Sequence, residues 1–119
     1  MSKLAELPLA VVDRAAIAAA VAALRAEWPV ERVILFGSKA RGDDEPDSDI
    51  DLVVITAVEV DRPTEDAMME AAWQAGMSHG RWVQLVVRSH ERWYHGIDQA
   101  TPLRLQVNQD GIEVFPDDG

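Results

Sequence analysis

Residues 33–38 read Val-Ile-Leu-Phe-Gly-Ser, and residues 48–54 read Ser-Asp-Ile-Asp-Leu-Val-Val. These two stretches are typical of buried strands, because each is a short apolar, β-branched run bounded by glycine or small polar residues. We expect the strands to cover Arg32–Phe36 and Ile50–Ile55. The loop between them, Gly37–Ser48, has room for one helical turn but not for a crossover helix, so the spacing predicts that the strands pair antiparallel.

Helical patterns lie on both sides of this strand pair. Asp13 is expected to cap an alanine-rich helix that Pro29 ends. The other expected elements are a helix opening at Asp61–Thr64 and ending at Gly76 or Gly80, a strand over Arg81–Val87, a short helix capped by Ser89, a helix opened by Thr101 and Pro102, and a strand over Ile112–Phe115. This order predicts a single α/β domain over 1–119, with a core of about 13–115. Helices flank a mixed sheet of three or four strands.

The composition excludes several classes of protein. The 119 residues include no cysteine, which removes disulfide scaffolds. The longest apolar run, Ala15–Leu24, is about half of what spans a bilayer, and no apolar signal core follows Lys3, so a cytoplasmic protein is expected. Eleven basic against twenty-one acidic residues give a net charge of −10. That charge repels a phosphate backbone and argues against bulk nucleic-acid binding, so any phosphate must be held by a local site with a divalent cation.

Residues 37–42 read Gly-Ser-Lys-Ala-Arg-Gly and carry groups that suit phosphate. Gly37 lets the backbone turn sharply after a buried strand and leaves no Cβ in the way of a ligand. Ser38 offers a hydroxyl and an amide N–H, and a helical turn starting there would aim its positive end at the same point. Lys39 and Arg41 are the only cations in an otherwise acidic loop, which favours a local phosphate site.

Asp49 and Asp51 lie two positions apart on the second strand, so both side chains point to one face while Ile50 and Leu52 point to the core. Two carboxylates whose Cα atoms are roughly 6–7 Å apart repel each other unless a cation lies between them. Mg²⁺ suits such a pair, because it takes one or two carboxylates and completes its shell with water and substrate phosphate. Together with the glycine turn, this pair predicts nucleotidyl transfer.

This combination resembles the hallmark of the minimal nucleotidyltransferase (MNT) family of the DNA polymerase β superfamily: an apolar strand, Gly-Ser, a spacer, and Asp-x-Asp between apolar residues. The Ala-Arg-Gly extension and the serine before the first aspartate also match. The resemblance implies a polymerase β-type fold that uses a nucleoside triphosphate, ATP for preference, with Mg²⁺. It also implies roles for five residues: nucleotide binding by Gly37, Ser38 and Arg41, and catalytic metal ligation by Asp49 and Asp51.

One position departs from the family pattern. The superfamily usually carries a third carboxylate in the middle of the next strand, where Gln84 stands in this chain. In the family that acid activates the attacking hydroxyl, and loss of a general base costs about 10²–10⁴ in rate. A neutral amide binds a metal through oxygen but accepts protons poorly. Two interpretations stay open: a slow or active enzyme, and a catalytically degenerate nucleotide-binding module. Gln84 is explained equally well as a plain strand residue.

The acceptor is expected on another protein, because larger relatives hold it with a second domain for which this chain has no room. In the MNT family the partner is often a HEPN-domain toxin. The MNT protein acts as its antitoxin by forming a complex and, in some members, by adding AMP to the toxin. The degenerate alternative would neutralise a HEPN-type partner by complex formation alone. The base, the acceptor residue and the oligomeric state stay open.

Other motifs carry less chemistry. The glycine spacing of a Walker A loop is present, but Asp43 and Asp44 stand where lysine and serine or threonine are required. The acidic run 43–47 fits a solvated loop and lacks the later ligands of a calcium loop. Three histidines share no metal-ligand spacing and are expected at the surface or in caps: His79, His90 and His95. Three tryptophans are expected in the core or at its edge: Trp73, Trp82 and Trp93. One member of the adjacent pair Trp93 and Tyr94 is a candidate for a partner surface.

Overall fold

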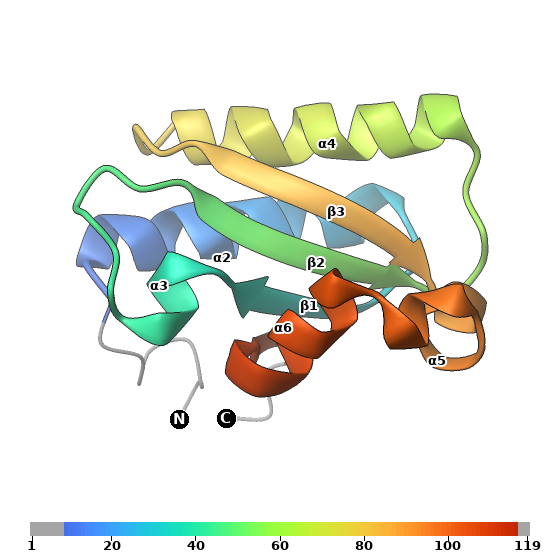
Figure 1. Cartoon of the computed structure of the whole chain (residues 1–119). Coiled ribbons are helices and arrows are strands. Elements are labelled where there is room, and N and C mark those ends of the chain that lie inside the picture. Colours follow the sequence, from blue (N-terminus) through green and yellow to red (C-terminus); the bar gives the residue numbers. More distant parts are fainter. Residues whose placement is uncertain (1–8, 117–119) are drawn as a thin grey trace.

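The sheet and its helices are described by a computed structural model over residues 9–116. The elements follow in this order: α2 (Val11–Glu27), β1 (Val30–Phe36), α3 (Ser38–Arg41), β2 (Ile50–Thr56), α4 (Arg62–Met77), β3 (Val83–Ser89), α5 (His90–His95), the 3-10 helix η1 (Ile97–Ala100), α6 (Pro102–Asp110) and β4 (Ile112–Phe115). Within this part of the chain, no helix is long and apolar enough to cross a membrane. Figure 1 shows the sheet between two layers of helices.

Four strands form one mixed sheet in the order β3-β2-β1-β4. Strand β1 pairs antiparallel with β2 and with β4, whereas β2 and β3 run parallel. The predicted antiparallel pairing of the first two strands is therefore confirmed, as is the single helical turn in the loop between them. Two parallel strands need a long crossover connection, and α4 with its 16 residues provides it.

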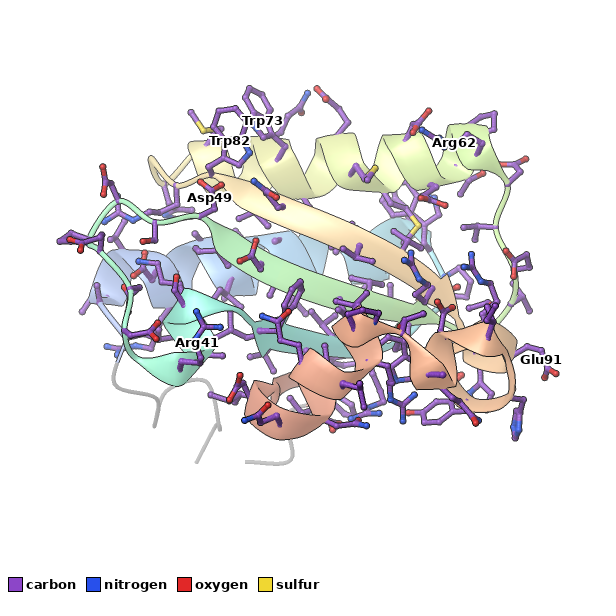
Figure 2. The ribbon with its side chains drawn as sticks, in the orientation of Figure 1. Arg41, Asp49, Arg62, Trp73, Trp82 and Glu91 are labelled. Carbon is purple, nitrogen blue, oxygen red and sulfur yellow. The ribbon has the colours of Figure 1, made fainter. Side chains whose placement is uncertain are left out.

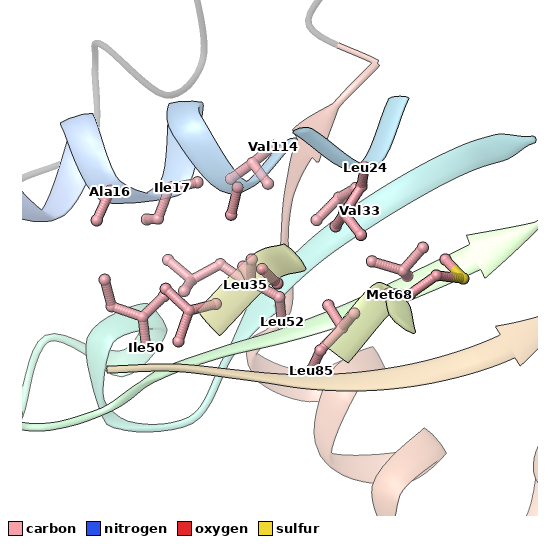
Figure 3. Close-up of a cluster of buried hydrophobic side chains, with 14 of the residues drawn as sticks. Ala16, Ile17, Leu24, Val33, Leu35, Ile50, Leu52, Met68, Leu85 and Val114 are labelled. Carbon is pink, nitrogen blue, oxygen red and sulfur yellow. The ribbon is translucent and has the colours of Figure 1, made fainter. Parts of the chain in front are cut away.

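One face of the sheet is covered by α2 and α4, which enclose the main core (Figure 3). Every second residue of β1, β2 and β3 points into this layer, as the two-residue period of a strand requires. The buried side chains of this cluster include Ala16, Ile17, Leu24, Val33, Leu35, Ile50, Leu52, Met68, Leu85 and Val114. The residues of the alanine-rich helix in this cluster thus lie on one face of α2, against the sheet.

The other face of the sheet is covered only in part. Helices α5 and α6 pack there on the alternate residues of the strands, around the fully buried Trp93. This smaller cluster joins Ile34 of β1, Val53 and Ile55 of β2, and Val107 of α6. Asp51 lies on this same face, toward the start of β2, because it alternates in step with Val53 and Ile55.

Three predicted helix starts are confirmed by side-chain caps. The side-chain oxygens of Asp61, Ser89 and Thr101 each accept a hydrogen bond from the backbone N–H three residues later. Two of these helices also have proline within their first two positions, where the missing N–H costs nothing. Gly111 ends α6 as expected, with its N–H donating to the carbonyl of Val107 at 2.7 Å.

The prediction that Asp13 caps the first helix is wrong. Helix α2 begins at Val11, its N-cap is Ala10, and Asp13 lies in the first turn with its side chain only 3% exposed. The Asp13 carboxylate instead pairs with two cations, Lys39 at 3.0 Å and Arg81 at 2.7 Å. Two charge-assisted contacts in a buried setting stabilise a carboxylate more than one capping hydrogen bond, which explains the difference.

Two of the three tryptophans are more exposed than the sequence predicts. Trp93 is 1% exposed and lies in the core, but Trp73 is 37% exposed and Trp82 is 54% exposed. Helix α4 buries Met68 and Ala72, so Trp73 lies beside that face rather than on it. Trp82 precedes the edge strand β3, where one flank has no neighbouring strand. The two exposed rings meet edge to face, with centroids 6.2 Å apart.

Candidate functional site

The turn after β1 brings the backbone against an acidic side chain. Gly37 has φ +77° and ψ −159°, a conformation that residues with a Cβ rarely adopt. A Cβ at this position would lie 2.5 Å from Oδ2 of Asp51. The predicted need for glycine here is thus physical: the turn approaches the second strand more closely than any side chain allows.

Helix α3 is one turn long and follows Gly37 directly. The amides of Ala40 and Arg41 donate to the carbonyl of Gly37 at 3.1 Å, and Gly42 closes the turn in the left-handed conformation with its N–H on the carbonyl of Ser38. Ser38 therefore sits at the start of the turn, beside the glycine that faces Asp51. The helical turn that the sequence predicts after Gly37 is therefore present.

Three residues form a row across the uncovered part of the sheet. Phe36 of β1 is the register partner of Asp51 in β2, and Asp51 is the register partner of Gln84 in β3. Neighbouring strands lie about 4.8 Å apart, and paired residues point to the same face. The residues on either side of Asp51, Ile50 and Leu52, are fully buried on the opposite face, as the alternation predicts.

Gln84 belongs to this row and touches the other predicted aspartate. Its Nε2 donates to Oδ2 of Asp49 at 2.6 Å. Asp49 immediately precedes β2, and Figure 2 shows it at the end of the sheet near the loop that carries α3. This contact favours Gln84 as part of the candidate site over Gln84 as a plain strand residue.

The electrostatics of the row favour a cation. Burial raises the pKa of the Asp51 carboxyl, the negative charge of Asp49 raises it further, and the positive charge of Arg41 opposes both. A carboxylate that is half-buried beside a second one is destabilised as an anion, and a bound cation offsets that cost. Two carboxylates suit Mg²⁺, which takes its other ligands from water and substrate phosphate.

Protein carboxylates alone do not complete a metal site here. Between residues 9 and 116, no three His, Cys, Asp or Glu side chains lie close enough together to hold a metal ion. The two carboxylates that could hold a metal ion at this end of the sheet are those of Asp49 and Asp51. The Gln84 side chain lies beside this pair, since its amide nitrogen is hydrogen-bonded to Asp49.

Arg41 ends the α3 turn, on the site side of the loop (Figure 2). Its Nε pairs with Oδ2 of Asp43 at 3.1 Å, and both side chains are exposed, at 38% and 62%. The hydrogen bond that Arg41 donates to Asp43 is the main cause of the raised pKa of Arg41. Water screens an exposed ion pair of this kind, so the Arg41 contact with Asp43 is exchanged at little cost.

The sequence position of Lys39 favours a local phosphate role, but its side chain lies away from the candidate site. Its side chain is fully buried, and its ammonium contacts Asp13 at 3.0 Å and Asp44 at 2.9 Å. Burial opposes the ammonium charge, but the hydrogen bonds to these two carboxylates outweigh it and raise the pKa of Lys39. Lys39 thus fastens the turn and the acidic loop to the start of α2. Sequence reasoning missed this contact, although an aspartate on the apolar side of a helix was a signal for it.

The acidic loop and the histidines behave largely as predicted. Asp43, Glu45 and Asp47 are exposed, and only Asp44 is held by Lys39. Of the histidines, two are exposed, while Nδ1 of His90 contacts the carboxylate of Glu31 at 2.7 Å.

The nucleotidyltransferase domain family matches residues 17–105, which is most of the chain. No curated protein matches the chain by sequence.

Solved structures share the fold. A toxin–antitoxin crystal structure with AMP-PNP superposes with a TM-score of 0.56 at 21% identity, covering 80% of this chain and 68% of that one. A variant of the MntA–HpeT toxin–antitoxin complex gives 0.56 at 20% identity, with the same coverage. A complex of tri-AMPylated HEPN toxin with MNT antitoxin from Shewanella oneidensis gives 0.51 at 21%, covering 80% of this chain and 65% of that one. The mixed sheet flanked by helices is therefore the fold found in these nucleotidyltransferase structures.

Proposed function

Because the chain belongs to the nucleotidyltransferase domain family, we propose that it transfers AMP from ATP to a hydroxyl on a partner protein, with Mg²⁺. The observation that carries this proposal is the approach of Gly37 to Asp51, since it joins a phosphate-suited turn to a carboxylate pair. A binding site for the triphosphate and a site for its metal ion thus share one corner of the sheet. The proposal treats the chain as one nucleotidyltransferase domain with its core at about 13–115.

Each predicted residue has a role in this proposal. Gly37 and Ser38 hold the triphosphate, and Arg41 binds a phosphate oxygen after leaving Asp43. Asp49 and Asp51 are the metal ligands. When bound, Mg²⁺ neutralises phosphate charge and supports the leaving pyrophosphate.

The transfer step balances as a substitution at phosphorus. The acceptor oxygen bonds to the α-phosphorus of ATP as the bond from that phosphorus to the pyrophosphate oxygen breaks. The proton of the acceptor hydroxyl passes to solvent, because Gln84 is neutral and donates its amide hydrogen to Asp49. Positioning and electrostatic stabilisation therefore supply the catalysis, and a slow rate is expected.

The partner in this proposal is a HEPN-type protein. Structures of the same fold contain an MNT antitoxin in complex with a HEPN toxin, and in one of them the toxin is AMPylated. The net charge of −10 also suits contact with a basic protein. These two observations support an antitoxin role without testing it.

A second candidate function rests on Gln84. An amide in place of the third carboxylate favours a module that binds nucleotide and neutralises its partner by complex formation alone. The two functions share the nucleotide site and differ only in whether AMP is transferred.

The deciding experiment incubates the protein with ATP labelled on its α-phosphate, Mg²⁺ and a purified HEPN-domain protein. Labelled partner is expected, and Asp49→Asn or Asp51→Asn should abolish the label. A matched control is Asp47→Asn, which changes an exposed loop carboxylate and should leave the label intact. Absence of label with the wild type, in the presence of a stable complex, would leave the binding module as the function.

A further inference from the structure

A groove of about 360 Å³ runs between helix α4 and the edge strand β3. One wall consists of Asp66, Met69, Glu70 and Trp73 from α4, and the other of residues 83–85 from β3. The proposed nucleotide site uses Gln84 of this lining and gives the other residues of the groove no role.

The groove opens onto the candidate site. Gln84 lines it and donates to Asp49 at 2.6 Å. Trp82, at the same end, accepts a hydrogen bond from the N–H of Ile50 through its carbonyl, at 2.9 Å. Figure 2 shows Trp73 and Trp82 together above Asp49. A molecule lying in the groove would therefore reach the acidic pair directly.

An apolar stripe lies along α4 beside the groove, and its exposure to water is unfavourable. Met69, Trp73 and Met77 recur at every fourth position of α4 and are 39%, 37% and 43% exposed. The more exposed Trp82 packs edge to face on Trp73 and extends the patch across to β3. Large exposed apolar side chains gathered in one place and rimmed by polar residues mark interaction sites.

The rim of the groove is acidic. Asp66 and Glu70 lie one helical turn apart beside the apolar stripe, and both line the groove. Asp66 pairs with Arg62 in an exposed contact, and Glu70 accepts a hydrogen bond from Gln74. Both contacts are exposed and are exchanged at little cost. In a chain of net charge −10, this rim complements cationic side chains.

We propose that this groove binds a segment of the partner protein in which basic side chains surround an apolar anchor. The anchor packs on Trp73 and Trp82, and the basic residues face Asp66 and Glu70. The inference rests on the proposed function in one respect: the partner that binds here is the protein that carries the acceptor hydroxyl. Docking in the groove brings that hydroxyl to the Asp49 end of the site.

A protein segment fits the groove better than the base of the nucleotide does. The α4 residues that line the groove run from Asp66 to Trp73, seven positions apart, which corresponds to about 10 Å along a helix and exceeds the length of a base. The acidic rim would also face the triphosphate that accompanies a base. Stacking of the base on Trp82 is the competing explanation, and the ATP affinity of the Trp82→Ala variant detects it.

The experiment measures the affinity of the purified full chain for the same purified HEPN-domain protein, by isothermal titration calorimetry. Glu70→Lys and Trp82→Ala should each weaken the complex by about tenfold or more, because one reverses the rim charge and the other removes the anchor platform. The matched control is Glu91→Lys, which makes the same charge change on the exposed surface of α5, far from Asp49 (Figure 2). The affinity of each variant for ATP with Mg²⁺ should equal that of the wild type.

The outcomes separate this inference from the proposed transfer. Equal partner affinity in Glu70→Lys and Glu91→Lys would refute partner binding in the groove. The lack of any complex with the wild type would refute it as well. Weaker ATP binding by Trp82→Ala, with partner affinity unchanged, overturns it in favour of base stacking. If the wild type transfers no label but its complex is still weakened by the groove variants, the transfer is refuted and the groove stands.

Discussion

Replacement of Lys39 by methionine tests the buried ion-pair network that holds the glycine turn. The ammonium of Lys39 lies between Asp13 and Asp44, and the Lys39 side chain has no exposed surface. Methionine has a similar length but no charge. Lys39→Met therefore leaves the packing largely in place and removes the cation that two carboxylates share.

Removal of one partner from a buried ion pair costs about 3–5 kcal/mol, because the remaining charge is left without compensation. Two features of this network favour the lower end of that range. Asp13 keeps its contact with Arg81 at 2.7 Å, and the Asp44 side chain is 22% exposed and can turn toward water. We therefore expect a loss of about 3 kcal/mol in the free energy of unfolding.

Urea denaturation followed by circular dichroism measures this loss. The matched control is Arg62→Met, which removes a surface ion pair of similar length, 3.1 Å, whose side chains are 80% and 59% exposed. That variant should lose only about 0.2–0.5 kcal/mol, because water screens exposed charges. A Lys39→Met loss within about 0.5 kcal/mol of the Arg62→Met loss would refute the view that burial gives the Lys39 network its strength.

The remaining predictions concern the site and its pH dependence. Gly37→Ala should cost about 1–3 kcal/mol of stability and abolish ATP binding in calorimetry. Gly42→Ala is the control and should keep ATP binding, because a Cβ there meets nothing within 4 Å. Equal ATP affinity in both variants would contradict the role of the close approach between Gly37 and Asp51. Gln84→Asp should raise the rate of label transfer by up to about 10²–10⁴, and an unchanged rate would show that the neutral amide does not limit transfer. The hydrogen bond from Lys39 lowers the pKa of Asp44, so the stability that this pair contributes is present at neutral pH and is lost as the pH falls through that lowered pKa. The stability difference between wild type and Lys39→Met should therefore shrink in acid, and a difference that grows in acid would contradict the pairing.

The strands, and the antiparallel direction of the first two, are readable from the sequence because their signals are local. The apolar runs around Gly37 and the Asp-x-Asp pair set the two central strands, and the short loop between them sets their direction. Side-chain oxygens at three helix starts likewise act on neighbours three residues away. Signals of this kind survive in a single sequence because both partners lie close together in the chain.

The misplaced residues depend on contacts between distant segments. Asp13 matches the local pattern of a helix cap. The partners that it contacts instead, Lys39 and Arg81, are 26 and 68 positions away, so no local pattern reveals them. The exposure of Trp73 and Trp82 depends on β3 being an edge strand, which no local pattern announces. Gln84 could be assigned to the third strand, but its contact with Asp49 needed the parallel register of β2 and β3.

Both halves of the proposed nucleotide site are carried by one β-hairpin, formed by β1 and β2 at the centre of the sheet. Any local unfolding that spares the central hairpin leaves Gly37 facing Asp51. Fraying at β4, or undocking of the α6 segment, would therefore alter what surrounds the chemistry while the phosphate-facing geometry persists. Such an arrangement separates a rigid reactive centre from a periphery that is free to diverge as partners change.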